Sequence, residues 1–256
     1  MPYVTFNGLQ YHYSAELPGG GVEPKQAIVF IHGSGGSHVN WKRQIKELGR
    51  EYIAIAVDLP GHGLSGGSPC YSIDDYTGFM KTFSDKVVGF PFFMAGHSMG
   101  GAVALNFALN YPEMLTGLVL IGTGARLKVL PSILESFKNG AIPDNMPSFL
   151  YKPGTPEEIL SISQEELKKS GPEVMFADMS ACDNFDVRDR LCEIDVHSII
   201  ITGEKDVMTP IKYGKYLADN MKNSSFEIIE DAGHMSMLEK PGSLNTIIYE
   251  FMKKHS

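Results

Sequence analysis

Three features that would place this chain in other functional classes are missing from its sequence. No run of Lys or Arg is longer than two residues, and the formal net charge is −8. This argues against a nucleic-acid-binding surface, which needs clustered basic side chains. No apolar run approaches the roughly 20 residues that cross a bilayer, and the first residues lack the basic and apolar segments of a signal peptide. We therefore expect a cytoplasmic protein with no nucleic-acid or membrane partner.

Metal and disulfide chemistry also lack support in the sequence. The three cysteines, Cys70, Cys182 and Cys192, are widely spaced and form no Cys-x-x-Cys pair, so neither a zinc knuckle nor a disulfide framework is indicated. The eight histidines include no His-x-x-x-His pair. We expect no metal and no cofactor, and nothing in the sequence indicates an oligomeric state.

What the sequence does contain is an alternation of β-type apolar runs with helical patterns. This alternation predicts an α/β fold with a mostly parallel sheet of about eight strands and helices on both faces. Asn7-Gly8 between two alternating runs predicts an antiparallel hairpin at the N-terminus. The clearest predicted strands are 27–31, 52–57, 90–95, 118–122, 198–203 and 226–229, and the clearest helices are 41–50, 73–88, 99–110, 211–221 and 243–254.

The segment from Arg126 to about Arg190 differs from the rest of the chain. It contains no β-type run, several prolines and glycines, and short helical patterns such as 161–170 and 172–179. We interpret residues 126–190 as a helical cap over the carboxyl ends of the strands, where open α/β sheets bind ligands. Residues 1–125 and 191–256 then form the core domain.

One short stretch, Gly96-His97-Ser98-Met99-Gly100, joins a predicted buried strand to a predicted helix. A serine in such a tight turn takes a positive φ, and its hydroxyl is pushed out at the end of the strand. The start of the following helix directs its positive dipole at the same point. We therefore identify Ser98 as a candidate nucleophile.

A serine nucleophile needs a base, and the base needs an acid that orients it. His234 follows the last predicted strand, and Asp206 follows the strand before it. Ser98 follows an earlier strand, so all three are expected at the same edge of the sheet. The order Ser, Asp, His along the chain is that of the α/β-hydrolases.

Five motifs together resemble the α/β-hydrolase fold family, in particular its serine carboxylesterases with a helical cap. They are spread over nearly the whole chain, each at a predicted strand end: His32-Gly33-Ser34-Gly35, Asp58-Leu59-Pro60-Gly61-His62-Gly63, Gly96–Gly101, Gly203-Glu204-Lys205-Asp206 and Asp231-Ala232-Gly233-His234. The resemblance implies Ser98 as nucleophile, His234 as general base and then acid, and Asp206 as the residue that orients His234.

The resemblance also implies an oxyanion hole built from the backbone N–H groups of Met99 and Ser34. Gly35 is the alternative to Ser34, because a loop this rich in glycine can present either N–H. Gly33, Gly35, His97 and Trp41 lie in or beside these motifs, and we expect them to contact the substrate. His32, His62 and His97 are expected to brace loops. The remaining histidines are expected at surface or edge positions: His12, His38, His197 and His255.

The function predicted from these residues is hydrolysis of small to medium apolar carboxylic esters through an acyl-enzyme intermediate. The expected partner is a small-molecule ester. The same residues also fit a carbon–carbon bond hydrolase of ring-cleavage products, a lactonase or a thioesterase. A non-enzymatic alternative is a ligand receptor or regulatory protein that retains the hydrolase fold.

Overall fold

We describe the fold from a computed structural model, which covers residues 2–21, 23–24, 26–143 and 145–256. The described strands form an eight-stranded sheet in the order β1-β2-β4-β3-β5-β6-β7-β8. All pairings are parallel except β1 with β2 and β2 with β4. The strands are β1 Tyr3–Phe6, β2 Leu9–Glu16, β3 Ala27–Ile31, β4 Ile53–Val57, β5 Phe92–His97, β6 Leu115–Ile121, β7 Ser198–Gly203 and β8 Ser224–Ile229.

The predicted α/β fold class, with a mostly parallel sheet and an antiparallel N-terminal hairpin, is confirmed. Asn7 and Gly8 have φ angles of 51° and 75°, as a two-residue hairpin turn requires. The hairpin pairs Tyr3 with His12 and Phe6 with Leu9. Strand β2 then runs on to Glu16, so its second half joins the hairpin to β4.

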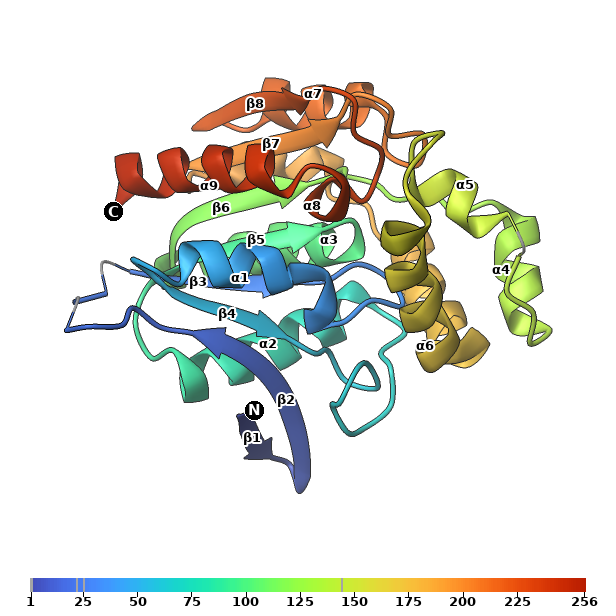
Figure 1. Cartoon of the computed structure of the whole chain (residues 1–256), viewed down its shortest axis with the longest axis horizontal. Helices are drawn as coiled ribbons and strands as arrows, with labels where there is room; N and C mark the ends of the chain where they lie inside the picture. Colours follow the sequence, from blue (N-terminus) through green and yellow to red (C-terminus); the bar gives the residue numbers. More distant parts are fainter. Residues whose placement is uncertain (1, 22, 25, 144) are drawn as a thin grey trace.

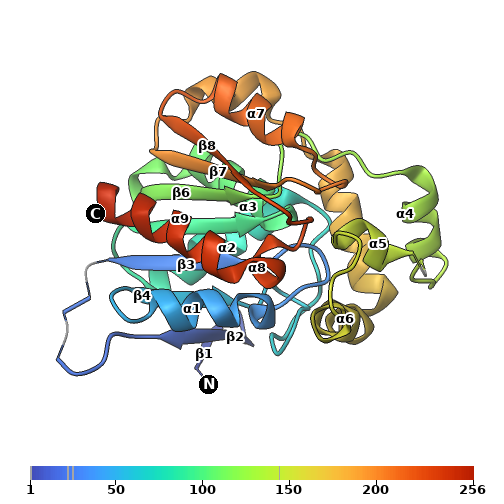
Figure 2. The same cartoon turned by 45° about the horizontal axis from the view of Figure 1, so that its top comes forward.

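Helices cover both faces of the sheet (Figures 1 and 2). Along β3, Ala27, Val29 and Ile31 pack on one face with α2 and α3, while Ile28 and Phe30 pack on the other with α1 and α9. This alternation explains why the strand is apolar at every position. The helices that flank the sheet are α1 Lys42–Leu48, α2 Ile73–Val87, α3 Met99–Asn110, α7 Ile211–Asn220, α8 Ser236–Glu239 and α9 Pro241–His255.

Three further helices, α4 Pro131–Lys138, α5 Met146–Leu150 and α6 Glu157–Asn184, lie together beyond the carboxyl ends of the parallel strands (Figure 1). We call them the cap helices. Helix α6 is kinked at Gly171, where φ is 74° and ψ is 173°, directly before Pro172. The two helical patterns predicted on either side of this point are therefore both present. The division into a core and a cap at residues 126 and 190 stays a prediction.

Short 3₁₀ segments complete the path: η1 His38–Trp41, η2 Pro112–Met114 and η3 Arg188–Glu193. The helix predicted over 41–50 is shorter than expected, because η1 precedes it and Gly49 ends it. Among the described residues, no helix is both long enough and apolar enough to cross a membrane.

Candidate active site

Ser98 lies between β5 and α3 in the strained conformation that its motif predicts, with φ 52° and ψ −116°. Its backbone is held on both sides, because its N–H donates to Ile121 O at 3.0 Å and its carbonyl accepts from Thr123 Oγ1 at 2.8 Å. A Cβ on Gly96 would lie 2.1 Å from the carbonyl oxygen of Gly100. The turn therefore forms only with glycine at position 96.

His234 and Asp206 are brought together from two separate strand ends. His234 Nδ1 lies 2.8 Å from Asp206 Oδ2, and both side chains are buried. Burial raises the pKa of Asp206, but the charge and hydrogen bond of His234 and the hydrogen bonds of Thr209 outweigh it, so the pKa is lowered. Asp206 is thus a carboxylate that accepts from Nδ1–H, which leaves Nε2 of His234 as the basic nitrogen.

Thr209 holds the carboxylate of Asp206 in place. Its hydroxyl donates to Asp206 Oδ2 at 2.8 Å, and its backbone N–H donates to Asp206 Oδ1 at 2.8 Å. The backbone N–H of Met208 donates to the same Oδ1 at 2.9 Å. Asp206 therefore has its remaining acceptor sites filled, and its orientation toward His234 is fixed.

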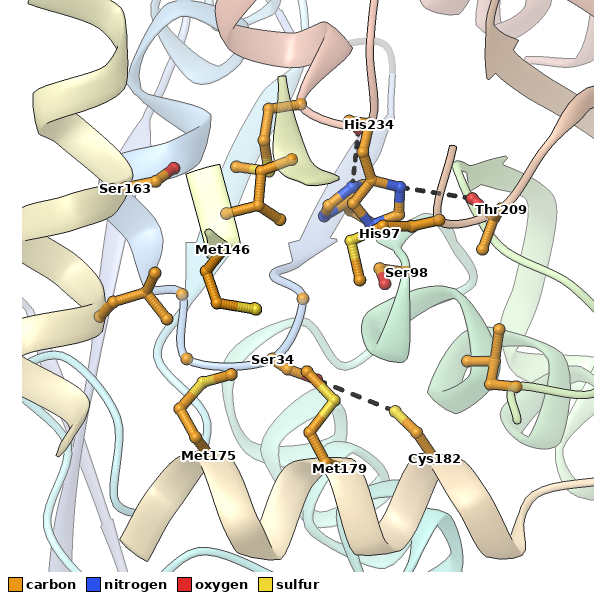
Figure 3. Close-up of a pocket in the computed structure, with 18 of the residues that line it drawn as sticks. Ser34, His97, Ser98, Met146, Ser163, Met175, Met179, Cys182, Thr209 and His234 are labelled. Carbon is orange, nitrogen blue, oxygen red and sulfur yellow. Dashed lines mark hydrogen bonds between the residues drawn. The ribbon is translucent and has the colours of Figure 1, made fainter. Parts of the chain in front are cut away.

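The predicted role of His97 as a loop brace agrees with its contacts. Its Nε2 donates to the backbone carbonyl of His234 at 3.0 Å, and the two rings lie 4.5 Å apart. Burial and the neighbouring charge of His234 lower the pKa of His97 well below its usual value, so this ring is neutral. Figure 3 shows Ser98 beside both rings, at the floor of the pocket.

The N–H groups of the loop after β3 differ in their hydrogen-bond partners. The N–H of Gly35 donates to the Asp178 carboxylate at 2.8 Å, and that of Gly36 donates to Gly33 O at 3.0 Å. Among the described residues, the N–H groups of Ser34 and Met99 have no acceptor within the protein. Two unpaired donors at a helix start and a neighbouring loop form an anion-binding arrangement.

A pocket opens above these residues, and its walls are mostly apolar (Figure 3). Gly33, Ser34, Gly35, His97, Ser98 and His234 line its floor. Five methionines line it as well, three from the cap helices and two from the loops after β7 and β8: Met146, Met175, Met179, Met208 and Met235. Methionine is flexible and polarisable, so such walls adapt to apolar ligands of different shape.

The prediction that Trp41 contacts the substrate is not supported by its position. Its side chain is fully buried and packs against Phe30, with ring centroids 4.9 Å apart, and it does not line the pocket. The 3₁₀ turn η1 directs this side chain into the core beneath the sheet. Trp41 therefore has a structural role.

His12 and His38, which we expected at surface or edge positions, are not exposed. Both are buried and contact the buried carboxylate of Asp58, with His12 Nδ1 2.7 Å and His38 Nδ1 2.9 Å from Asp58 Oδ2. In the described part of the chain, these three residues alone are spaced for a metal ion. Asp58 also accepts the N–H groups of His38 and Leu64, so its oxygens already join strand β2 and the turn η1 to its own loop.

Asp178 and Thr209 are functional candidates that the sequence did not reveal to us. Thr209 follows Asp206 by three residues, a spacing at which an aspartate commonly accepts from the next turn. Asp178 is the one acid within a run of cap-helix residues that are otherwise apolar or small. An isolated carboxylate on an apolar helix face is the signal that could have identified it.

Comparisons with known proteins agree with this geometry. The sequence model of the α/β hydrolase fold family matches residues 26–241. A 2-hydroxy-6-oxononadienedioate/2-hydroxy-6-oxononatrienedioate hydrolase from Burkholderia vietnamiensis is 27% identical, over 96% of this chain and 92% of that protein. A pimeloyl-[acyl-carrier protein] methyl ester esterase from Legionella pneumophila is 27% identical, over 88% of this chain and 95% of that protein.

Among solved structures, a thermophilic esterase superposes with a TM-score of 0.87 and 32% sequence identity, over 100% of this chain and 98% of that one. The match of the family model covers most of the chain, and the elbow, the strand order and the helices around the sheet are those of the fold. The protein therefore belongs to the α/β hydrolase fold family and is a hydrolase.

Proposed function

We propose that this protein is a serine carboxylesterase that acts through an acyl-enzyme intermediate. His234 Nε2 takes the proton of the Ser98 hydroxyl as Oγ bonds to the ester carbonyl carbon. The negative charge that develops on the carbonyl oxygen is stabilised by the N–H groups of Ser34 and Met99. The intermediate collapses as the C–O bond to the alcohol breaks and His234 returns the proton to the alcohol. Water, activated by His234, then releases the acid and regenerates Ser98.

The observation that carries this proposal is the pairing of His234 with Asp206 above the elbow serine. The 2.8 Å contact between His234 Nδ1 and Asp206 Oδ2 fixes the tautomer that a general base for Ser98 requires. The three side chains come from three different strand ends. A histidine with only a structural role would not need a serine and an aspartate brought to it from two other strands. The two unpaired N–H groups nearby supply the oxyanion site.

The pocket walls favour a neutral substrate with an apolar acyl group. The charged side chains that line the pocket are Lys128 and Glu166. Lys128 is half exposed and contacts Asp183, whereas Glu166 is buried and bonds to Ser37 and Lys169. Each of these charges already pairs with an opposite charge of the protein, so neither is free for an ionic group of the substrate, and an uncharged acyl group suits the apolar walls.

Carbon–carbon bond hydrolysis is the second candidate, and it is supported by the names of two relatives. The relative from Burkholderia vietnamiensis is named for a dienedioate substrate, and another from Comamonas testosteroni for a phenylhexadienoate. Lactonase and thioesterase activities need the same serine and the same oxyanion site. A receptor that uses the site for one slow turnover would also contain these residues.

A series of p-nitrophenyl esters from acetate to decanoate, run beside a ring-cleavage dienone, tests the proposal. We expect repeated turnover of short and medium esters and a much lower kcat/KM for the dienone. The Ser98→Ala variant should lose turnover and keep its thermal unfolding transition. A higher kcat/KM for the dienone would favour the second candidate. Release of nitrophenol that stops near one equivalent would instead favour a receptor.

A further inference from the structure

The cap helix α6 contacts the loop after β3, residues 32–37, through the buried carboxylate of Asp178. Asp178 is completely buried, and its carboxylate accepts three hydrogen bonds from three separate segments of the core. Gly35 N–H donates to Oδ2 at 2.8 Å, His62 Nε2 donates to the same oxygen at 2.9 Å, and the Tyr76 hydroxyl donates to Oδ1 at 2.6 Å. The mechanism proposed above assigns no role to Asp178.

The charge of Asp178 is balanced by His62. The other ring nitrogen of His62, Nδ1, lies 3.0 Å from the carbonyl oxygen of Pro60, which can only accept. Nδ1 therefore donates to Pro60, and Nε2 faces the carboxylate of Asp178. Burial lowers the pKa of His62, but the charge and hydrogen bond of Asp178 outweigh it and raise the pKa. Asp178 and His62 thus form a buried pair, and the three hydrogen bonds to the Asp178 side chain hold it in one orientation.

Both peptide groups of Gly35 are held by the same helix. Its N–H donates to Asp178, and its carbonyl accepts from Ser170 Oγ at 3.0 Å. Gly35 has a φ of 64°, and a Cβ added there would lie 2.3 Å from the sulfur of Met175, also on α6. The loop is therefore docked closely against the cap helix, and its backbone has little freedom to rotate.

This docking decides which N–H faces the pocket. With the N–H of Gly35 directed at Asp178 and that of Gly36 directed at Gly33 O, the N–H of Ser34 is left for a ligand. The N–H of Ser34 lies in the preceding peptide, between Gly33 and Ser34, and its orientation depends on how firmly the next peptide, which carries the Gly35 N–H, is anchored. If the Asp178 contact were lost, this anchor would be lost and both peptides could rotate. The oxyanion site would then lose its alignment, although Ser98, His234 and Asp206 would stay in place.

We propose that Asp178 is a positioning residue for the oxyanion hole, through which the cap sets the orientation of the Ser34 N–H. This inference rests on the proposed serine-hydrolase function. It assigns to the cap a second task besides covering the pocket. Because the donor must meet an oxygen that becomes negative only in the transition state, its loss should lower kcat more than it changes KM.

The test compares Asp178→Asn with Glu173→Gln, which makes the same carboxylate-to-amide change at an exposed position of the same helix. Two quantities are measured for each: kcat and KM for a p-nitrophenyl ester, and the affinity for a trifluoromethyl ketone, which forms an oxyanion adduct with a serine. We expect Asp178→Asn to lower kcat on the order of 10²-fold. Its KM should stay within about threefold, and its ketone affinity should fall in parallel with kcat. Glu173→Gln should match the wild type.

Ser170→Ala keeps the proposal testable if Asp178→Asn fails to fold, because Ser170 is only half-buried and its loss removes a single bond to Gly35. We expect a smaller drop in kcat, about fivefold, with KM unchanged. A folded Asp178→Asn variant with wild-type kcat would overturn the proposal. So would a variant in which only KM rises or only the thermal stability falls.

Labelling by a fluorophosphonate separates this failure from failure of the proposed function. The probe phosphonylates an activated serine, with loss of fluoride, and needs no ester turnover. A wild-type protein that reacts with the probe but hydrolyses no ester contradicts the esterase proposal alone. The positioning role then still predicts slower labelling of Asp178→Asn than of Glu173→Gln, and equal rates would contradict it.

Discussion

The carboxylate of Asp206 lies 2.8 Å from Nδ1 of His234, and the hydroxyl of Thr209 donates to the same carboxylate oxygen. Two strand ends about 30 residues apart in the chain thus meet in one buried hydrogen-bonded group. The contact determines which nitrogen of His234 is free to accept a proton. The chemistry assigned to Ser98 depends on this relationship.

Replacing Asp206 by Asn should disable the base while leaving the fold in place. An amide at this position can stabilise the wrong tautomer of His234 and cannot stabilise its charged form. By analogy with protease triads, we expect kcat to fall on the order of 10⁴-fold. Steady-state kinetics with a p-nitrophenyl ester measures this loss.

Asp231→Asn is the matched control for that experiment. Asp231 is exposed and contacts Lys152 and Lys240, so its loss should change kcat by less than about threefold. A loss below about tenfold for Asp206→Asn, or a large loss for Asp231→Asn, would mean that another acid orients His234.

Trp41→Phe should leave the kinetics nearly unchanged, although the sequence motif beside it suggested substrate contact. The side chain is buried against Phe30 and does not line the pocket. We expect kcat/KM within about twofold of wild type, with the free energy of unfolding lower by ~1–3 kcal/mol. Ester kinetics and urea unfolding check the two parts separately. A rise in KM without a loss of stability would show that Trp41 does contribute to substrate binding.

Asp58 should make the stability of the protein depend on acid pH. Burial raises the pKa of this carboxyl, but the hydrogen bonds and charge of His38, with the N–H of Leu64, lower it to about 2. A folded-state pKa below the unfolded value of 3.8 stabilises the fold above pH 3.8, and this contribution is lost as the pH falls through about 2. This contribution of Asp58 to the free energy of unfolding is about 2 kcal/mol.

The measurement is the free energy of unfolding by urea between pH 5 and pH 2. Asp58→Asn should show a decline with falling pH that is smaller than that of the wild type by about 2 kcal/mol. Asp219→Asn, an exposed change on α7, should keep the wild-type pH dependence. Equal declines in all three proteins would show that the Asp58 cluster does not titrate as described.

The apolar walls of the pocket predict a change in acyl-chain preference. Met146 comes from cap helix α5, is buried, and lines the pocket. Met146→Ala should widen the cavity, so the optimum in a p-nitrophenyl ester series should move to longer chains, while stability falls by roughly 2–5 kcal/mol. Met114→Ala, outside the pocket, should keep the optimum. An unchanged optimum in Met146→Ala would show that Met146 does not contact the acyl chain of the substrate.

Much of the fold could be predicted because most of the parallel strands contain a continuous apolar run, and several of them end in a polar or glycine-rich motif. The carboxyl ends of parallel strands meet at one edge, so Ser98, Asp206 and His234 could be placed together without coordinates. The N–H of Gly35 could not be assigned, because its acceptor, Asp178, comes from a helix more than a hundred residues away. Such a contact depends on cap packing, which has no local sequence pattern.

Two expectations were not matched by where the side chains lie. Trp41 adjoins the glycine-rich loop in the sequence, but a 3₁₀ turn directs its side chain away from the pocket. His12 lies on a strand of the N-terminal hairpin, and its ring is buried against the carboxylate of Asp58, 46 residues further along the chain. In neither case does the local sequence determine the direction of the side chain.

The most direct test of the account is to identify the residue that becomes acylated. Wild-type protein is mixed with p-nitrophenyl butyrate, quenched in acid within the first turnover, and digested for peptide mass spectrometry. We predict a butyryl adduct on Ser98 that forms with the burst of nitrophenol and disappears as turnover proceeds, and no adduct in Ser98→Ala. Continued ester turnover by Ser98→Ala, or an acyl group on another residue of the wild type, would contradict the account.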